Sequence, residues 1–133
     1  MAWLGMMTIL VDTYDRGIEY FTNSLGFSLI EDSVLSPEKR WVVIAPNQSE
    51  GARILLAQAT SPSQVAAIGN QTGGRVGLFL YTDDFDGDYS RMLARGVDFI
   101  ETPRAEKYGK VALFRDIFGN KWDFIEGVAG KFG

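Results

Sequence analysis

The sequence predicts an α+β domain built from two βαβββ modules, whose strands form a curved eight-stranded mixed sheet with the helices on its convex face. An internal repeat supports this prediction, because segment 27–32 recurs as segment 97–102 with matching hydrophobic positions. Each segment follows an amphipathic helical pattern that ends at a glycine, Gly26 in the first case and Gly96 in the second. A repeat of this kind indicates one supersecondary unit used twice.

The first module begins with a strand at residues 7–11. Asp12 or Thr13 then caps a helix over 14–25, since either side chain accepts a hydrogen bond from a free amide of the first turn. Ile18, Phe21 and Leu25 form the apolar face of this helix. Three strands are expected after it, at residues 27–31, 40–45 and 53–59.

The second module repeats this order with a strand at 75–81 and a helix that follows Asp83 and Asp84 and ends near Ala94. Further strands are expected at residues 97–101, 111–115 and 121–126, the last two joined by a turn at 116–120. A chain of 133 residues is long enough for one domain with its own core. We therefore expect a single domain over 1–133, with module one at 6–59, a linker at 60–74 and module two at 75–127. Within the linker, 64–68 could form a helical turn.

Composition excludes several classes of function. The formal net charge is −4 and the sequence pI is about 4.8, which disfavours nucleic acid as a partner. No run of 18 apolar residues is present, so no membrane span is predicted. The first residues lack the basic and apolar regions of a secretory signal, and we expect a cytoplasmic protein.

Histidine and cysteine are both absent from the sequence. Histidine is the commonest transition-metal ligand and the usual general base near neutral pH. Cysteine supplies thiolate ligands, nucleophiles and disulfides. Their absence removes the familiar zinc sites and nucleophilic triads from consideration.

Two motifs resemble those of a known family. Segment 14–27 resembles the first-helix signature, and segment 114–123 the closing hairpin, of the vicinal-oxygen-chelate superfamily of glyoxalases, bleomycin-resistance proteins and extradiol dioxygenases. With the internal repeat, the resemblance covers nearly the whole chain. It implies the glyoxalase/bleomycin-resistance fold and, for a single-domain member, a homodimer.

The resemblance also implies where a divalent metal would bind, since members of the superfamily take ligands from the first and last strand of each module. The corresponding positions are Met6, Leu55, Gly77 and Asp123. Only Asp123 has a hard oxygen donor, and a one-residue shift in register would bring in Gln58 or Glu126 but no histidine. We therefore predict no metal and no other cofactor.

Strand alternation predicts which side chains face the ligand pocket. The predicted pocket consists of Met6, Thr8, Trp41, Leu55, Gly77, Phe79, Tyr81, Leu113 and Asp123, with Leu10, Val43, Val111 and Ile125 beside them. Alternative structural roles remain open. Trp41 could be a packing residue, and Asp123 could form a salt bridge with Arg53, Arg115 or Lys121. The charged segment 103–109 could clamp an anion, close as a lid or be a solvated turn.

The first hypothesis for function is a metal-independent small-molecule-binding protein, similar to bleomycin-resistance proteins, that sequesters a drug or metabolite. Trp41, Phe79 and Tyr81 would stack on a planar cationic ligand, and Asp123, the candidate catalytic residue, would pair with its charged group. The second hypothesis is a glyoxalase-like lyase or isomerase, a transferase or a dioxygenase-type enzyme with Asp123 as acid/base or metal ligand. The third is a partner-binding domain with a vestigial pocket.

Overall fold

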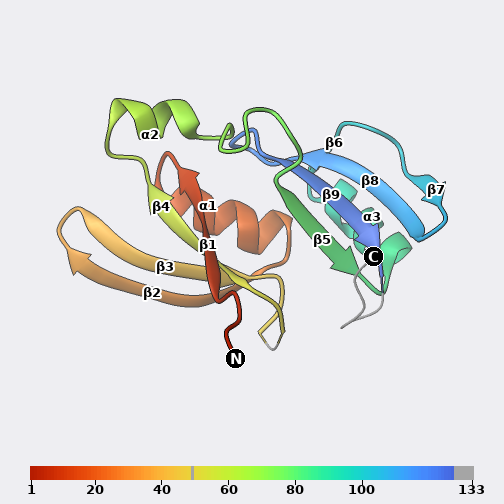
Figure 1. Cartoon of the computed structure of the whole chain (residues 1–133), viewed down its shortest axis with the longest axis horizontal. Helices are drawn as coiled ribbons and strands as arrows, with labels where there is room; N and C mark the ends of the chain where they lie inside the picture. The colour runs from red at the N-terminus through yellow and green to blue at the C-terminus, as the bar shows by residue number, and fades with distance from the viewer. Residues whose placement is uncertain (49, 128–133) are drawn as a thin grey trace. The chain divides into compact units, whose positions relative to one another are not determined.

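The computed structural model describes residues 1–48 and 50–127. The chain divides into two compact units, Met1–Ile68 and Gly69–Gly133 (Figure 1). The strands form two mixed sheets, a four-stranded sheet in the first unit and a five-stranded sheet in the second. The predicted α+β class is confirmed. The first unit has the predicted βαβββ order, whereas the second has one strand more after its helix. The described strands form two sheets, of four and five strands, where a single eight-stranded sheet was predicted.

The first unit has its strands in the order β1-β4-β3-β2, with β1 parallel to β4 and the other neighbours antiparallel. Its elements are β1 (Met6–Val11), α1 (Tyr14–Glu19), a π-helical turn η1 (Tyr20–Ser24), β2 (Ser28–Ser36), β3 (Lys39–Ala45), β4 (Arg53–Gln58) and α2 (Pro62–Ala67). The single helix predicted over 14–25 is therefore an α-helical turn continued by a π-helical one.

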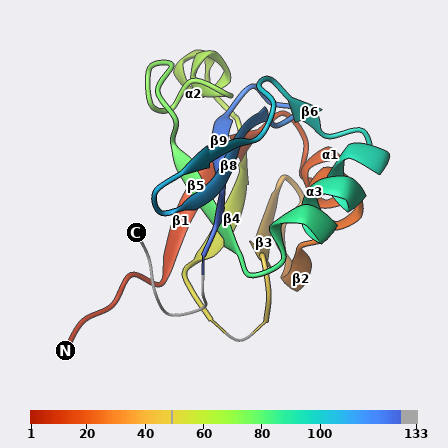
Figure 2. The ribbon, with the colours of Figure 1, turned by 90° about the vertical axis from the view of Figure 1, so that its right-hand side faces the viewer.

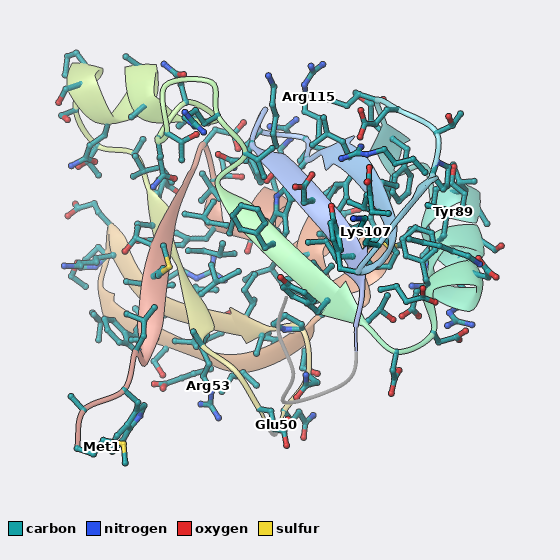
Figure 3. The ribbon with its side chains drawn as sticks, turned by 45° about the vertical axis from the view of Figure 1, so that its right-hand side comes forward. Met1, Glu50, Arg53, Tyr89, Lys107 and Arg115 are labelled. Carbon is teal, nitrogen blue, oxygen red and sulfur yellow. The ribbon has the colours of Figure 1, made fainter. Side chains whose placement is uncertain are left out.

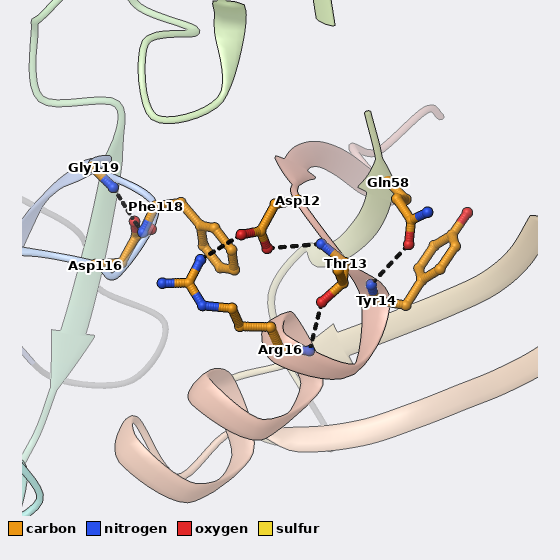
Figure 4. Close-up of polar contacts among 8 residues, drawn as sticks. All are labelled: Asp12, Thr13, Tyr14, Arg16, Gln58, Asp116, Phe118 and Gly119. Atoms are coloured by element: carbon orange, nitrogen blue, oxygen red, sulfur yellow. Dashed lines mark hydrogen bonds and ion pairs between the residues drawn. The ribbon is translucent and has the colours of Figure 1, made fainter. Parts of the chain in front are cut away.

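Side chains at the start of α1 fix where the helix begins (Figure 4). The Thr13 hydroxyl accepts a hydrogen bond from the Arg16 amide at 3.2 Å, and Asp12 accepts one from the Thr13 amide at 2.7 Å. The Tyr14 amide donates to the Gln58 side chain at the end of β4, at 3.2 Å. Thr13 is thus the cap of α1, and Gln58 ties the helix to the sheet.

A glycine in α1 lets the helix lie close to its sheet. A Cβ atom at Gly17 would lie 3.0 Å from Leu56 Cδ1 and 3.1 Å from Val11 Cγ1, so a larger residue would push the helix away. The core of this unit lies between the helix and that face of the sheet. Its strand residues are Ile9, Val11, Val42, Ile44, Ile54 and Leu56.

The second unit repeats the strand order of the first, as β5-β9-β8-β6, with the additional strand β7 paired to β8. Its elements are β5 (Leu78–Thr82), α3 (Phe85–Ala94), β6 (Asp98–Phe99), β7 (Arg104–Glu106), β8 (Gly109–Arg115) and β9 (Lys121–Glu126). The helix lies on one face of this sheet (Figure 2). There the Phe85 ring stacks on that of Phe124 with 5.0 Å between centroids, and Tyr89 contacts Phe99 at 4.5 Å.

Several predicted boundaries differ from the structure. The strand expected at 27–31 continues to Ser36, because it pairs with β3 as a long hairpin. The strand expected from residue 75 begins at Leu78. The helical turn considered at 64–68 is the helix α2, which begins earlier because Ser61 caps it and a proline occupies its first turn.

The second unit also contains a strand that the sequence did not predict. The strand expected at 97–101 is limited to β6, and part of the charged segment 103–109 forms β7. The residues of β7 are exposed at the edge of the sheet. Charged residues are common on edge strands because they discourage pairing with other chains, and this composition hides the strand from a search for apolar alternation. Within the described ranges, no helix is long and apolar enough to cross a membrane.

A buried carboxylate organises the turn between β8 and β9. Asp116, 3% exposed, accepts hydrogen bonds through Oδ1 from the amides of Phe118, Gly119 and Asn120, at 2.9–3.0 Å. Its Oδ2 accepts from Asn120 Nδ2 and from Trp122 Nε1, both at 2.9 Å (Figure 4 shows the bond to Gly119). The motif that carried the family resemblance is thus a hydrogen-bonded turn that fixes the start of β9.

Candidate functional site

In the first unit, the predicted pocket residues share the face of the sheet that α1 does not cover. Thr8 pairs with Leu55, and Leu55 pairs with Val43, so the three side chains lie side by side on this face. Met6 and Trp41 lie on the same face, each two residues along its strand. The structure therefore brings Met6, Thr8, Trp41 and Leu55 together on one surface.

In the second unit, the equivalent helix-free face carries the other predicted residues. Phe79 pairs with Asp123, and Asp123 pairs with Leu113, which places the three on one line across β5, β9 and β8. Tyr81 lies on the next line on that face, beside Ile125. Phe79 stands out because it is 57% exposed. Leu113 and Asp123 are half-buried.

Gly77 lies just before β5, and its amide donates to the Lys121 carbonyl at 3.1 Å. A Cβ atom at this position would lie 2.8 Å from Thr72 Cγ2. The Thr72 hydroxyl is itself bonded to the Arg75 carbonyl at 2.6 Å. A residue with a side chain at position 77 would therefore have to displace Thr72.

Asp123 lies in an environment that disfavours its charged form. Burial raises the pKa of the Asp123 carboxyl, the positive charge of Arg104 opposes that rise, and the negative charge of Glu101 adds to it. Within the described part of the second unit, no hydrogen bond or ion pair engages this carboxylate, including from Arg115 or Lys121. Lys121 instead donates to the Gly74 carbonyl at 3.2 Å.

Arg104 belongs to the charged segment 103–109, which the sequence indicated as a possible anion clamp, lid or solvated turn without giving this residue a role of its own. Its Nη1 forms an ion pair with Glu101, and its Nε donates to Glu106 at 2.8 Å. Two other cations of the unit lie elsewhere: Lys107 in the turn after β7, and Arg115 at the far end of β8 (Figure 3). The sequence does show an acidic, a basic and an acidic residue at positions 101, 104 and 106. Because β7 was not predicted, nothing in the sequence indicated that these side chains lie on the sheet near Asp123.

A sequence model described as the Glyoxalase/Bleomycin resistance protein/Dioxygenase superfamily matches residues 3–124. The chain belongs to this superfamily.

Other superfamily members and a related protein match nearly the whole chain. An uncharacterized protein of Shewanella frigidimarina (strain NCIMB 400) is 47% identical over 121 residues, which cover 90% of each chain. A superfamily member from Sphaerobacter thermophilus DSM 20745 has a similar structure, with a TM-score of 0.75 and 26% identity over 96% of this chain and 98% of that one. TnmS3, an antibiotic binding protein from Streptomyces sp. CB03234, has a TM-score of 0.75 and 23% identity over the same shares.

The metal positions that superfamily resemblance implies have an unsuitable set of donors in this chain. Met6 offers a thioether and Asp123 a carboxylate, while leucine and glycine at the other two positions offer no side-chain donor. In each unit the two positions are also not opposite each other in the sheet. Leu55 pairs with Thr8 rather than with Met6, and Asp123 pairs with Phe79 rather than with Gly77. Among residues 1–48 and 50–127, no three acidic, histidine or cysteine side chains gather closely enough to hold a metal ion. These residues do not fit a divalent metal.

Proposed function

We propose that the protein is a metal-independent, small-molecule-binding member of the superfamily that sequesters a planar cationic drug or metabolite, acting as a homodimer in the cytoplasm. The observation that carries the proposal is an exposed aromatic ring beside a carboxylate that forms no hydrogen bond or ion pair with any residue of the described ranges. Phe79 and Asp123 lie side by side on the helix-free face of the second sheet. Similarity to an antibiotic binding protein supports the same class of function.

The chemistry of this surface favours a flat ring that carries a positive charge. The face of an aromatic ring attracts planar and cationic groups, and Phe79 exposes such a face. A half-buried carboxylate gains more from a neighbouring cation than one in open water, because the local dielectric is lower. Asp123 therefore provides charge recognition, and Phe79, Tyr81 and Leu113 provide apolar contact.

Two probes that share one ring system test this proposal. Proflavine is a planar cation at neutral pH, whereas acridine has the same three rings and is neutral. We expect saturable proflavine binding by fluorescence titration, weakened about tenfold in Asp123→Asn, because a partly desolvated ion pair is lost. Acridine binding should stay within about twofold in that variant, while Phe79→Ala should weaken both probes. A wild type that binds neither probe would refute the proposal and favour a vestigial pocket.

One observation favours an enzyme as the second candidate. The raised pKa of Asp123 suits a carboxyl that exchanges a proton with a substrate, as a lyase, isomerase or dioxygenase-type enzyme requires. Turnover that is lost in Asp123→Asn, with an unchanged circular dichroism spectrum, would establish this function. Proflavine binding without turnover of glyoxalase-type or epoxide substrates would leave sequestration as the function.

A further inference from the structure

Three carboxylates and one guanidinium gather around the predicted site in the second unit. Arg104 lies on β7 and pairs with Val111, on the same sheet face as Asp123. Glu101 and Glu106 lie on either side of Arg104 in sequence, and both form ion pairs with it. The charges of Arg104 and Glu101 are felt at the Asp123 carboxyl, so the cluster forms one electrostatic unit.

Arg104 is a potential partner for Asp123 that the structure keeps engaged elsewhere. Its Nη1 bonds Glu101 and its Nε bonds Glu106, which fixes the plane and direction of the guanidinium. An arginine on the same sheet face as a half-buried carboxylate, with its charge felt there, would ordinarily pair with it, because the carboxylate has lost part of its hydration. The two glutamates thus compete with Asp123 for the same cation.

This competition determines which carboxylate of the cluster is open to a ligand. With Arg104 held by the glutamates, the cluster contains three negative charges and one positive charge, and Asp123 is open. If Arg104 paired with Asp123, that carboxylate would be closed by an ion pair and could not bind the cationic group of a ligand that packs on Phe79. The charge of Arg104 is balanced by the two glutamates that it bonds.

We propose that Glu101 and Glu106 are specificity-determining residues, which hold the Arg104 guanidinium away from Asp123 and so keep that carboxylate available to the cationic group of a ligand. The role of the cation rests on the proposed function, whereas the holding of Arg104 is a property of the protein alone. The two parts can therefore be tested separately.

The first experiment needs no ligand. In a crystal structure of the double variant Glu101→Gln/Glu106→Gln, we expect the Arg104 guanidinium to lie within about 4 Å of the Asp123 carboxylate. The wild-type crystal structure should keep Arg104 on the two glutamates. An Arg104 that stays in its original place, or extends into solvent, in the double variant would overturn the proposal.

The second experiment measures selectivity with proflavine and acridine. The double variant should bind proflavine about tenfold more weakly than wild type and should bind acridine equally well, because only the charge recognition is blocked. Adding Arg104→Met to the double variant should restore most of the proflavine affinity. A triple variant that stays as weak as the double variant would show that the glutamates act by another route and would overturn the proposal.

A matched control separates this effect from a general loss of negative charge. On α3, Arg91 is likewise held by two carboxylates, those of Asp84 and Asp88. The variant Asp84→Asn/Asp88→Asn removes the same number of charges from the same unit and frees one arginine. It should change proflavine affinity by less than about twofold. An equal loss of proflavine affinity in the glutamate and the aspartate double variants would contradict the proposal. A wild type that binds no proflavine would refute the proposed function, and the crystal structure of the glutamate double variant would then decide the role of the glutamates.

Discussion

Asp116 shows how one residue supports both the turn and the strand that carries the site. Its two oxygens accept five N–H donors, so loss of the carboxylate leaves several buried donors without a partner. We expect Asp116→Ala to lower the free energy of unfolding by about 3 kcal/mol. Asp116→Asn should also destabilise the protein, by about 2 kcal/mol, because an NH₂ group then faces N–H donors.

Urea denaturation measures both changes in the free energy of unfolding. Asp83→Asn, at an exposed position, serves as a control that should change stability by less than about 0.5 kcal/mol. Equal stability of Asp116→Ala and the control would contradict this role.

Asp123 is expected to have the opposite effect on stability. Its pKa is raised in the folded protein, so folding disfavours the charged carboxylate once the pH exceeds the pKa of the unfolded chain. Wild-type stability should therefore fall, relative to Asp123→Asn, as the pH rises from that unfolded value through the folded pKa. Above the folded pKa the variant should be the more stable protein. Urea midpoints measured across this pH range test the sign, and a wild type that gains on the variant with rising pH would disprove it. A residue that costs stability is a common feature of binding sites.

At the scale of elements, Arg40 connects three parts of the first unit. It lies on β3, donates two hydrogen bonds to Asp32 on β2 at 3.1 and 2.8 Å, and bonds Asp15 on α1 at 2.8 Å. Its guanidinium also lies over the Tyr14 ring, 5.3 Å from the centroid. We expect Arg40→Met to lower the free energy of unfolding by about 1 kcal/mol near neutral pH, since the network is partly exposed.

The pH dependence of this loss follows from Asp32. The hydrogen bonds from Arg40 lower the pKa of the Asp32 carboxyl, so its contribution is present above the unfolded pKa and is lost as the pH falls through the folded pKa. The stability difference between wild type and Arg40→Met should thus shrink in acid, as measured by urea midpoints. A difference that stays constant down to strongly acidic pH would show that Arg40 acts by packing alone.

Elements were predictable where one face of them is apolar. The helical segment of α1 and η1, the helix α3, the glycines that follow them and the strand β9 could be predicted from periodicity, because burial of one face enforces a regular pattern. The long hairpin end of β2 and the strand β7 were missed, because exposed edge strands carry polar or charged residues that resemble loops. The same limit applies to the site. Alternation placed Phe79 and Asp123 on one face, but the role of Arg104 depends on β7 and on contacts that no local pattern encodes.

At the scale of the whole molecule, the absence of histidine and cysteine leads to the last prediction. Any metal site in these 133 residues would have to be built from oxygen donors and the weak thioether of methionine, and the superfamily positions supply one carboxylate. We expect protein purified without chelator and reloaded with zinc, manganese, iron or nickel to hold far less than one metal per chain. Its Tm should not change with EDTA, because a metal that binds only the folded state would raise Tm. Mass spectrometry of the metal content gives the stoichiometry. A value near one metal per chain would mean that the four positions are wrongly placed, and the glyoxalase or dioxygenase function would then become the first hypothesis.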